Sequence, residues 1–377
     1  WAQGGENMIF GGFLFNPVDG NSYLAKMVQG EQGAWKFYLP FTFEDGRGSY
    51  LYLFYLALGH LGRGLGLSNL AVFHGARIFA GMIMLGALWV FFREIFESPD
   101  RRKWAFILAA LGSGLGWLGI PAGFITMDFW VAEAYPFLSA YANPHFPFGL
   151  AILLIILTPR LVKHPLLKAL LSLLLAVIQP FAVVVALLVF LGKFLVDSLE
   201  EFIVSRKVSL NRERMQDVLA VGAGGGPFLV YQYWVINSHE LLQIWNQQNQ
   251  TPSPPLWNTA LSLLPCLALA GLAVKRSWQN EKHRILLIWA AGGLILAYLP
   301  WSLQRRFLTG IHVPLTGLAV IGMDQMIAKY KGRAREVRGL VLALMLPTNL
   351  IILASGINAA AVQDRTIYLP RTDRAAL

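Results

Sequence analysis

The chain has 377 residues, of which 56% are hydrophobic and only 14% are charged, and its mean hydropathy is +0.52. Soluble domains carry about 25% charged residues, so this composition excludes a soluble protein and indicates a polytopic membrane protein built from helices. The single cysteine, Cys266, excludes disulfides and cysteine metal sites, and membrane topology explains the net charge of +10 better than nucleic-acid binding does.

Residues 1–72 precede the first long apolar stretch, and we expect them to form an external catalytic loop with interfacial helices. The chain begins with Trp1 rather than Met, which predicts a further helix before it. Within this segment Asp19 precedes an amphipathic run, 23–28, with helical spacing. Asp19 either caps that helix within a turn or acts as a base beside the bilayer.

Apolar stretches of about 15 to 22 residues follow, the length of membrane-spanning helices. They predict a transmembrane domain over 73–356 with about 9–11 spans, followed by an external C-terminal tail over 357–377. The expected spans are 73–92, 104–120, 146–161, a double stretch over 166–196, 218–236, 256–274, 285–300, 307–326 and 339–355. A glycine run at 222–226 lacks the lysine of a phosphate loop, which favours close helix packing or a broken helix.

The loops between these stretches fall into two groups by charge. Two of them, 121–144 and 237–255, contain no Lys or Arg, whereas five are basic: 93–103, 160–168, 193–214, 275–284 and 329–338. Positive loops stay inside, so the first group is expected to be external and the second cytoplasmic in the plasma (inner) membrane. Because basic loops flank 166–196, that stretch is expected to be a helical hairpin turning at Gln179 and Pro180.

Several polar side chains gather on the predicted external side. Arg305 and Arg306 break the charge rule, and arginines at a span edge commonly pair with an anion or reach lipid headgroups. Asp128, Glu133 and His145 follow the second predicted span. A guanidinium can hold phosphate oxygens while a carboxylate takes a proton from an attacking hydroxyl.

Each of these residues also has a simpler interpretation. Asp128 and Glu133 would be solvated side chains of an interfacial helix, and His145 a helix cap or headgroup contact. The amide-rich run that begins at Trp245 would bind a sugar or form an ordinary polar loop.

The chain resembles the GT-C superfamily of membrane glycosyltransferases, in particular the bacterial protein-mannosyltransferase and aminoarabinose-transferase-like group. The resemblance lies in the Asp19 segment, the span start at 75–78, the short hairpin, and the Arg305-Arg306 pair leading into 313–318. In that family the first external loop carries the catalytic carboxylate, which implies Asp19 as the base. The usual acidic pair is absent, since Gly20 and Asn21 follow Asp19, so the resemblance supports no metal or other cofactor.

The resemblance implies transfer of a hexosyl or pentosyl group from a polyprenyl-phosphate donor to a hydroxyl of a glycan, lipid or protein in the bacterial cell envelope. The residues expected to bind substrate are Asn21, Tyr23, Glu133, His145, Trp245, Arg305 and Arg306. The alternatives are a transporter or lipid flippase, which predicts polar groups at mid-membrane depth and an internal repeat, and a membrane scaffold without catalysis.

Overall fold

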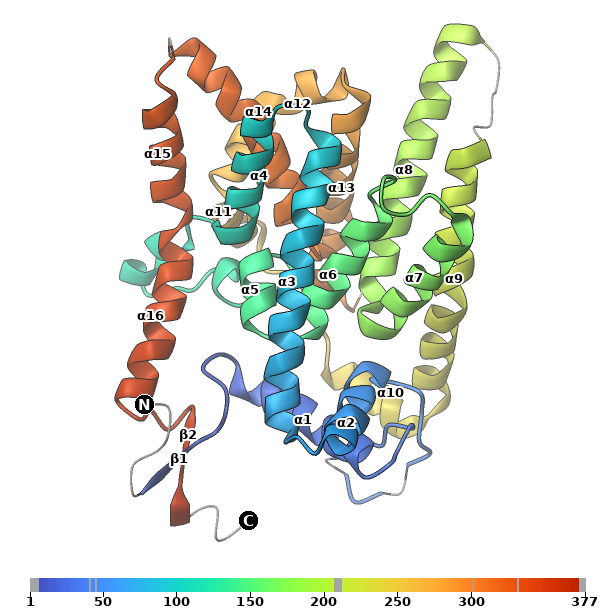
Figure 1. The fold of residues 1–377 in the computed structure, drawn as a ribbon, viewed down its shortest axis with the longest axis vertical. Coiled ribbons are helices and arrows are strands. Elements are labelled where there is room, and N and C mark those ends of the chain that lie inside the picture. Colours follow the sequence, from blue (N-terminus) through green and yellow to red (C-terminus); the bar gives the residue numbers. More distant parts are fainter. Residues whose placement is uncertain are drawn as a thin grey trace.

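The computed structural model describes residues 7–40, 42–44, 46–206, 212–300, 302–330 and 332–372. Over these residues the chain is mostly helical with almost no sheet, which confirms the predicted all-α polytopic fold (Figure 1). The first elements are β1 (Met8–Phe10), α1 (Pro17–Glu31), α2 (Leu53–Leu65), α3 (Asn69–Ile95), α4 (Pro99–Leu111), η1 (Gly116–Ala122), η2 (Met127–Phe129), α5 (Pro136–Tyr141), α6 (His145–Ile156), α7 (Pro165–Ile178) and α8 (Pro180–Ser205). The remaining elements are α9 (Arg212–Ser238), α10 (Glu240–Gln248), α11 (Leu256–Leu263), α12 (Cys266–Trp278), α13 (Glu281–Tyr298), η3 (Gln304–Leu308), α14 (His312–Lys329), α15 (Ala334–Met345), α16 (Pro347–Ala361) and β2 (Tyr368–Pro370).

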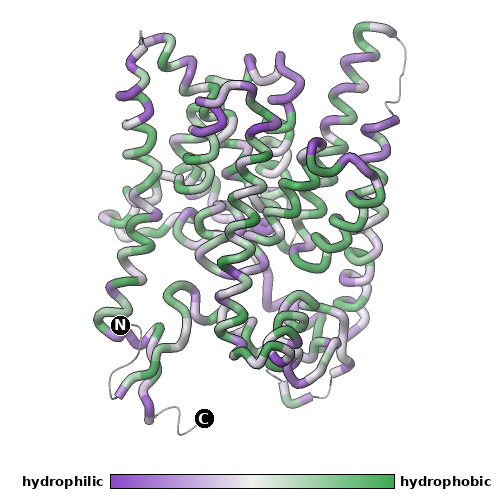
Figure 2. The backbone as a smooth tube through the Cα atoms, viewed as in Figure 1, coloured by the Kyte–Doolittle hydropathy of each residue, from purple (hydrophilic) through white to green (hydrophobic). Residues whose placement is uncertain are grey.

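Three described segments are long and apolar enough to cross a bilayer: α3, α8 and Pro99–Ala122, which contains α4 and η1. The bent pairs α11–α12 and α15–α16 raise this number to five if each pair is one span. Figure 2 shows apolar residues along the middle of the long helices and hydrophilic residues toward their ends. The chain is therefore a multi-pass membrane protein. Fewer helices than the predicted nine to eleven meet this test, because several expected spans are short or broken.

The predicted basic loops lie together at one end of the molecule, where ion pairs join them. These pairs are Glu94–Arg160, Glu97–Lys282, Asp100–Arg338 and Glu281–Arg214. The helices α1, α2 and α10 lie at the opposite end (Figure 1). The fold thus places the basic loops at one end and the loop 237–255 at the other, as their charges predict, and the compartment that each end faces stays a prediction.

The stretch 166–196 forms the predicted hairpin, with a break at Gln179 between α7 and α8. Since α7 has 14 residues, it is about 21 Å long and shorter than the ~30 Å hydrocarbon core. It packs closely on α9, where a Cβ atom at Gly224 would lie 2.0 Å from the carbonyl oxygen of Ala169. The glycine run of α9 therefore serves close helix packing, as one of the two sequence interpretations predicts.

The predicted solvated position of Asp128 is wrong, because this carboxylate is completely buried. The Asp128 carboxylate accepts hydrogen bonds from five donors: the hydroxyls of Ser113, Thr126 and Thr348 and the backbone N–H groups of Gly114 and Gly116. Such donors stabilise a buried charge in the absence of a cation. Asp128 thereby ties the break after α4 to η2 and α16.

We expect Asp128→Ala to lower the free energy of unfolding by on the order of 3–5 kcal/mol, because five buried donors lose their acceptor at once. Thermal unfolding in detergent measures this change. Asp100→Ala is the matched control: it removes a carboxylate that is 51% exposed in a surface ion pair, and such pairs are worth about 0–1 kcal/mol. Equal losses in the two variants would show that the Asp128 network does not hold these segments together.

The segment 126–146, expected in part as an external loop, is largely buried among the helices. Its backbone is hydrogen-bonded by the start of α14, where the N–H groups of Gly310 and His312 donate to the carbonyl oxygens of Glu133 and Ala134. Irregular backbone at such depth requires partners of this kind. The loop lacks Lys and Arg because it is enclosed, and it carries Glu133 into the interior.

The two ends of the described chain meet in a small antiparallel sheet, where β1 pairs with β2 and Ile9 lies opposite Leu369. Figure 1 shows this two-stranded sheet below α16, at the same end of the molecule as α1. The C-terminal tail is therefore attached to the N-terminal segment at that end.

Candidate functional site

Asp19 lies in the first turn of α1. The helix begins at Pro17, nearly two turns before the predicted amphipathic run, and Asn16 is its N-cap, so Asp19 itself is not the cap. The side-chain amide of Asn16 donates to Oδ2 of Asp19 at 2.6 Å. The Asp19 side chain is exposed, and its negative charge is favourable near the positive end of the helix dipole.

One face of α1 combines a carboxylate, a phenol and an ammonium group. Tyr23 and Lys26 follow Asp19 by four and seven residues, which places all three on the same side of the helix. Asn21 is two residues from Asp19, about 200° around the helix, and is exposed. The structure therefore groups Tyr23 with Asp19 and places Asn21 on the other face, where its predicted contact with substrate stays a prediction.

The Lys26 ammonium group lies among aromatic rings. Its Nζ donates to the backbone oxygen and hydroxyl of Ser22, and lies 4.5 Å from the ring centroid of Tyr52 and 4.9 Å from that of Tyr23. These contacts are cation–π interactions. Burial lowers the pKa of Lys26 to about 8, and the negative charge of Asp19 acts in the opposite direction.

Tyr23 connects this face of α1 to α2 and α6. Its ring stacks on that of Tyr55 with centroids 4.2 Å apart, and the Tyr55 hydroxyl is hydrogen-bonded to Nδ1 of His145 at 2.6 Å. Trp245, on α10, lies edge-on to Tyr52 with centroids 6.1 Å apart. The predicted residues His145 and Trp245 thus border the same aromatic cluster from two other elements.

Glu133 pairs with both predicted arginines and is 3% exposed. Its Oε1 accepts a hydrogen bond from a terminal nitrogen of Arg306 at 3.2 Å and lies 3.4 Å from Nε of Arg305. The predicted solvated alternative for Glu133 is therefore wrong. The two arginines diverge from this shared partner, and the guanidinium of Arg305 lies 4.8 Å from the Trp130 ring centroid.

Arg306 is the arginine that faces the α1 cluster. Burial lowers the pKa of its guanidinium, but the negative charge of Glu133 and, with a smaller effect, that of Asp19 raises this pKa overall. Tyr23 and Tyr52 are also near enough to interact electrostatically with it. Lys26 therefore contacts both tyrosine rings, and Arg306 carries a second positive charge close enough to interact electrostatically with them.

Three residues of this cluster were not selected from the sequence: Lys26, Tyr52 and Tyr55. The helical spacing from Asp19 to Lys26 was a usable signal, because it indicates a shared helix face. Tyr52 directly precedes α2 and Tyr55 lies in its first turn. Only the packing of α2 on α1 brings the two residues to the site.

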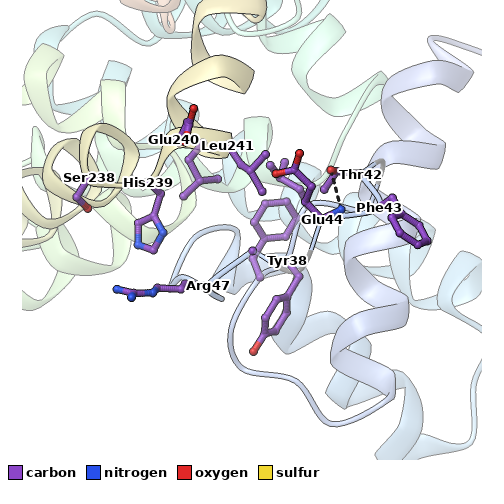
Figure 3. Close-up of a pocket in the computed structure, with 13 residues that line it drawn as sticks. Tyr38, Thr42, Phe43, Glu44, Arg47, Ser238, His239, Glu240 and Leu241 are labelled. Carbon is purple, nitrogen blue, oxygen red and sulfur yellow. Dashed lines mark hydrogen bonds between the residues drawn. The ribbon is translucent and has the colours of Figure 1, made fainter.

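An open cavity of about 670 Å³ lies beside this cluster. It is formed by the loop before α2 and by the corner between α9 and α10, and Figure 3 shows Glu44 and Arg47 of the loop together with His239 and Glu240 of the corner. Phe37 belongs both to this cavity and to the surroundings of Lys26, since its ring centroid lies 5.8 Å from Nζ. The cavity is thus adjacent to the cluster and has polar walls.

Among the described residues, no three His, Cys, Asp or Glu side chains come together in a group that could hold a metal ion. The two carboxylates of the cluster differ in their surroundings, because Glu133 is paired with arginines and Asp19 is exposed. The expectation that the protein works without a metal stays a prediction.

The fold is similar to that of the oligosaccharyltransferase from Archaeoglobus fulgidus. The apo form of that protein has a TM-score of 0.51 at 14% identity, covering 89% of this chain and 51% of that one. Its structures with a tethered acceptor peptide containing the NVT sequon and with Zn and sulfate both have TM-scores of 0.49 at 15% identity. They cover 89% and 90% of this chain and 50% and 49% of that one, so this chain spans about half the length of the oligosaccharyltransferase.

No family model matches the sequence, and no curated protein matches it. The likeness in structure therefore shows the fold alone, a helical membrane fold similar to that of an archaeal oligosaccharyltransferase. The GT-C superfamily and its narrower mannosyltransferase or aminoarabinose-transferase type stay predictions.

Proposed function

We propose that this protein is a membrane glycosyltransferase that moves a sugar from a polyprenyl-phosphate donor to an acceptor hydroxyl at the external face of the plasma membrane. The observation that carries this proposal is the arrangement around Tyr23 and Tyr52, whose rings Lys26 contacts and with which Arg306 interacts electrostatically, in a fold similar to that of an oligosaccharyltransferase. Asp19 supplies a carboxylate on the same face of α1. Cations beside an available carboxylate suit a reaction with a phosphate leaving group.

In the proposed reaction, Asp19 takes the proton of the acceptor hydroxyl as its oxygen attacks the anomeric carbon of the sugar. The new bond joins that oxygen to the anomeric carbon, and the bond from this carbon to the phosphate oxygen breaks. The electron pair leaves with the lipid phosphate, whose negative charge Arg306 and Lys26 stabilise. Attack opposite to the leaving group inverts the configuration.

The formal charges of the site favour an anionic donor. Three cations, Lys26, Arg305 and Arg306, face two carboxylates, Asp19 and Glu133, which leaves one positive charge without a counter-charge among these residues. A phosphodiester donor carries one negative charge and would complete the balance. Tyr23 and Trp245 offer flat surfaces on which sugar rings commonly pack, and the amides that follow Trp245 offer hydrogen bonds.

We place the acceptor in the cavity shown in Figure 3. Its volume of about 670 Å³ is within the range of small-molecule sites. Phe37 lies between this cavity and Lys26. An acceptor bound in the cavity would therefore reach the Lys26 cluster past the Phe37 ring. Glu44, Arg47, His239 and Glu240 provide polar contacts for a glycan or peptide.

The test uses purified protein in lipid vesicles with a labelled, short-chain polyprenyl-phosphate sugar and an extract of envelope acceptors. We expect loss of the labelled donor, release of polyprenyl phosphate and label in an acceptor. A transporter or flippase would move the labelled lipid to the opposite leaflet without consuming it. Transfer across the bilayer with an intact donor would therefore favour that alternative.

The titration of Lys26 predicts a loss of donor binding at alkaline pH. Its pKa is lowered to about 8, so the ammonium group loses its proton above that pH and attracts phosphate less strongly. We expect the KM for the donor to rise above pH 8 in the unaltered protein, and Lys26→Gln to show the high KM already at pH 7.

A stability measurement distinguishes this effect from unfolding. The folded protein holds the Lys26 proton less tightly than the unfolded chain does, so the cost of this burial is fully present below pH 8 and is relieved as the pH rises toward the ordinary lysine pKa. The free energy of unfolding should therefore rise slightly with pH as this cost disappears, while donor binding weakens. A KM that stays constant between pH 7 and 9 would remove Lys26 from the donor site.

A further inference from the structure

A second cavity, of about 250 Å³, lies on the other side of the residues that precede α1. It is lined by the segment from Phe10 to Phe15, by α3 and by the end of α5. Phe13 forms part of its wall and packs edge-on against Phe73, which in turn lies beside Tyr55. These rings separate the cavity from the Tyr23–Tyr55 pair.

The cavity contains a cation without a carboxylate partner. Arg77 lies eight residues after the start of α3, about 12 Å along the helix, in a segment long and apolar enough to span the membrane. One of its terminal nitrogens donates to the carbonyl oxygen of Tyr141. Its Nε is buried with no hydrogen-bond partner, and none of the ion pairs found in the described part of the chain includes Arg77.

His74, one turn earlier on α3, lines the same cavity and has a defined tautomer. Its Nε2 lies 2.9 Å from the carbonyl oxygen of Gly12, which can only accept, so Nε2 carries the proton. Nδ1 of the neutral ring is then an acceptor, and it too is buried with no partner. The cavity thus presents an unused cationic donor and an unused acceptor on one face of α3.

An arginine within a membrane-spanning helix is costly unless an anion or polar group meets it. Arg77 lies about two turns from the start of α3, and phospholipid headgroups lie near the ends of membrane-spanning helices. A phosphodiester accepts from Nε of Arg77, and a hydroxyl on the same headgroup donates to Nδ1 of His74. The volume is below the range of about 300–1,000 Å³ for drug-sized ligands and suits a headgroup.

We propose that this cavity is a binding site for an anionic phospholipid whose headgroup carries a hydroxyl, as in a phosphoglycerol headgroup. The site is independent of the glycosyl-transfer site and of the function proposed for it. Arg77 binds the phosphate, His74 selects the hydroxyl, and Phe10, Phe15 and Tyr141 exclude water from these contacts.

The test measures lipid retention by native mass spectrometry after the protein is exchanged from nanodiscs of phosphatidylcholine containing phosphatidylglycerol. We expect one phosphatidylglycerol to be retained, and Arg77→Gln to weaken its binding by roughly ten- to a hundredfold, as loss of a charge-assisted hydrogen bond predicts. Arg63→Gln is the matched control, since Arg63 is an exposed arginine of α2, and it should retain the lipid. Equal retention of phosphatidylcholine and phosphatidylglycerol, or unchanged binding in a folded Arg77→Gln variant, would overturn the proposal.

His74 provides a second test that does not depend on the Arg77 variant folding. Phosphatidylmethanol carries the same charge without the hydroxyl, so the unaltered protein should prefer phosphatidylglycerol to it, and His74→Gln should abolish that preference. Soluble glycerol 1-phosphate and inorganic phosphate serve as further probes. Their displacement of the lipid at equal concentration would assign the cavity to a free phosphate and contradict a lipid site.

Discussion

Replacement of Asp19 by Asn is expected to reduce sugar transfer by about 10² to 10⁴ while the protein still folds and binds its donor. The structure explains why the Asp19→Asn variant should still fold. Asn16 caps α1, so an amide at position 19 keeps the contact with Asn16 and loses only its favourable charge near the helix dipole. That loss is about 0.3–1 kcal/mol. Donor consumption measures the rate of sugar transfer, and thermal unfolding of the same preparation measures the stability of the variant.

Asn16→Ala is the control for Asp19→Asn, because it removes the helix cap and leaves the carboxylate in place. It should lower the free energy of unfolding by about 1 kcal/mol and change turnover far less than Asp19→Asn does. If instead Asp19→Asn transfers sugar at nearly the normal rate, Asp19 is a helix-terminal charge and not the base. Glu133 would then be the next carboxylate to test.

The elements that the sequence predicts well are those whose pattern is local. The hairpin at Gln179 and Pro180 follows from basic loops on both sides and a helix-breaking proline, and the structure has its break there. The grouping of basic loops likewise follows from composition, and the ion pairs between them confirm it. Both features need only neighbouring residues for their prediction.

The features that the sequence does not predict depend on how distant segments pack. The sequence suggests that Asp128 is solvated, because its partners are hydroxyls and backbone N–H groups that form no recognisable pattern. Thr348 can donate to Asp128 only because α16 lies beside η2. The separate directions of Arg305 and Arg306 also depend on the packing of η3 against Glu133. Tyr52 and Tyr55 join the site only because α2 packs on α1, through Gly30 and Gly59, where any side chain would meet the opposing backbone.

Arg306→Ala is expected to weaken donor binding by roughly ten- to a hundredfold, since a charge-assisted contact to phosphate contributes about 1.5–3 kcal/mol. Arg305→Ala is the matched control for Arg306→Ala. Arg305 also contacts Glu133, but its guanidinium lies over the Trp130 ring. Each variant leaves Glu133 with one arginine, so neither creates an unpaired buried carboxylate. The measurement is the dissociation constant of a non-hydrolysable polyprenyl-phosphate analogue for both variants. It distinguishes the loss of any positive charge from the loss of a direct contact between Arg306 and the phosphate.

The expected order is a large loss for Arg306→Ala and a smaller one for Arg305→Ala. The reason is geometric: Arg306 shares its surroundings with Tyr23, Tyr52 and Asp19, whereas Arg305 is directed toward Trp130. Lys26→Gln should fall between them, because its ammonium borders the same tyrosines but keeps two of its donors on Ser22. Equal, small losses in both arginine variants would assign the pair to lipid headgroups and leave Lys26 as the cation nearest the donor.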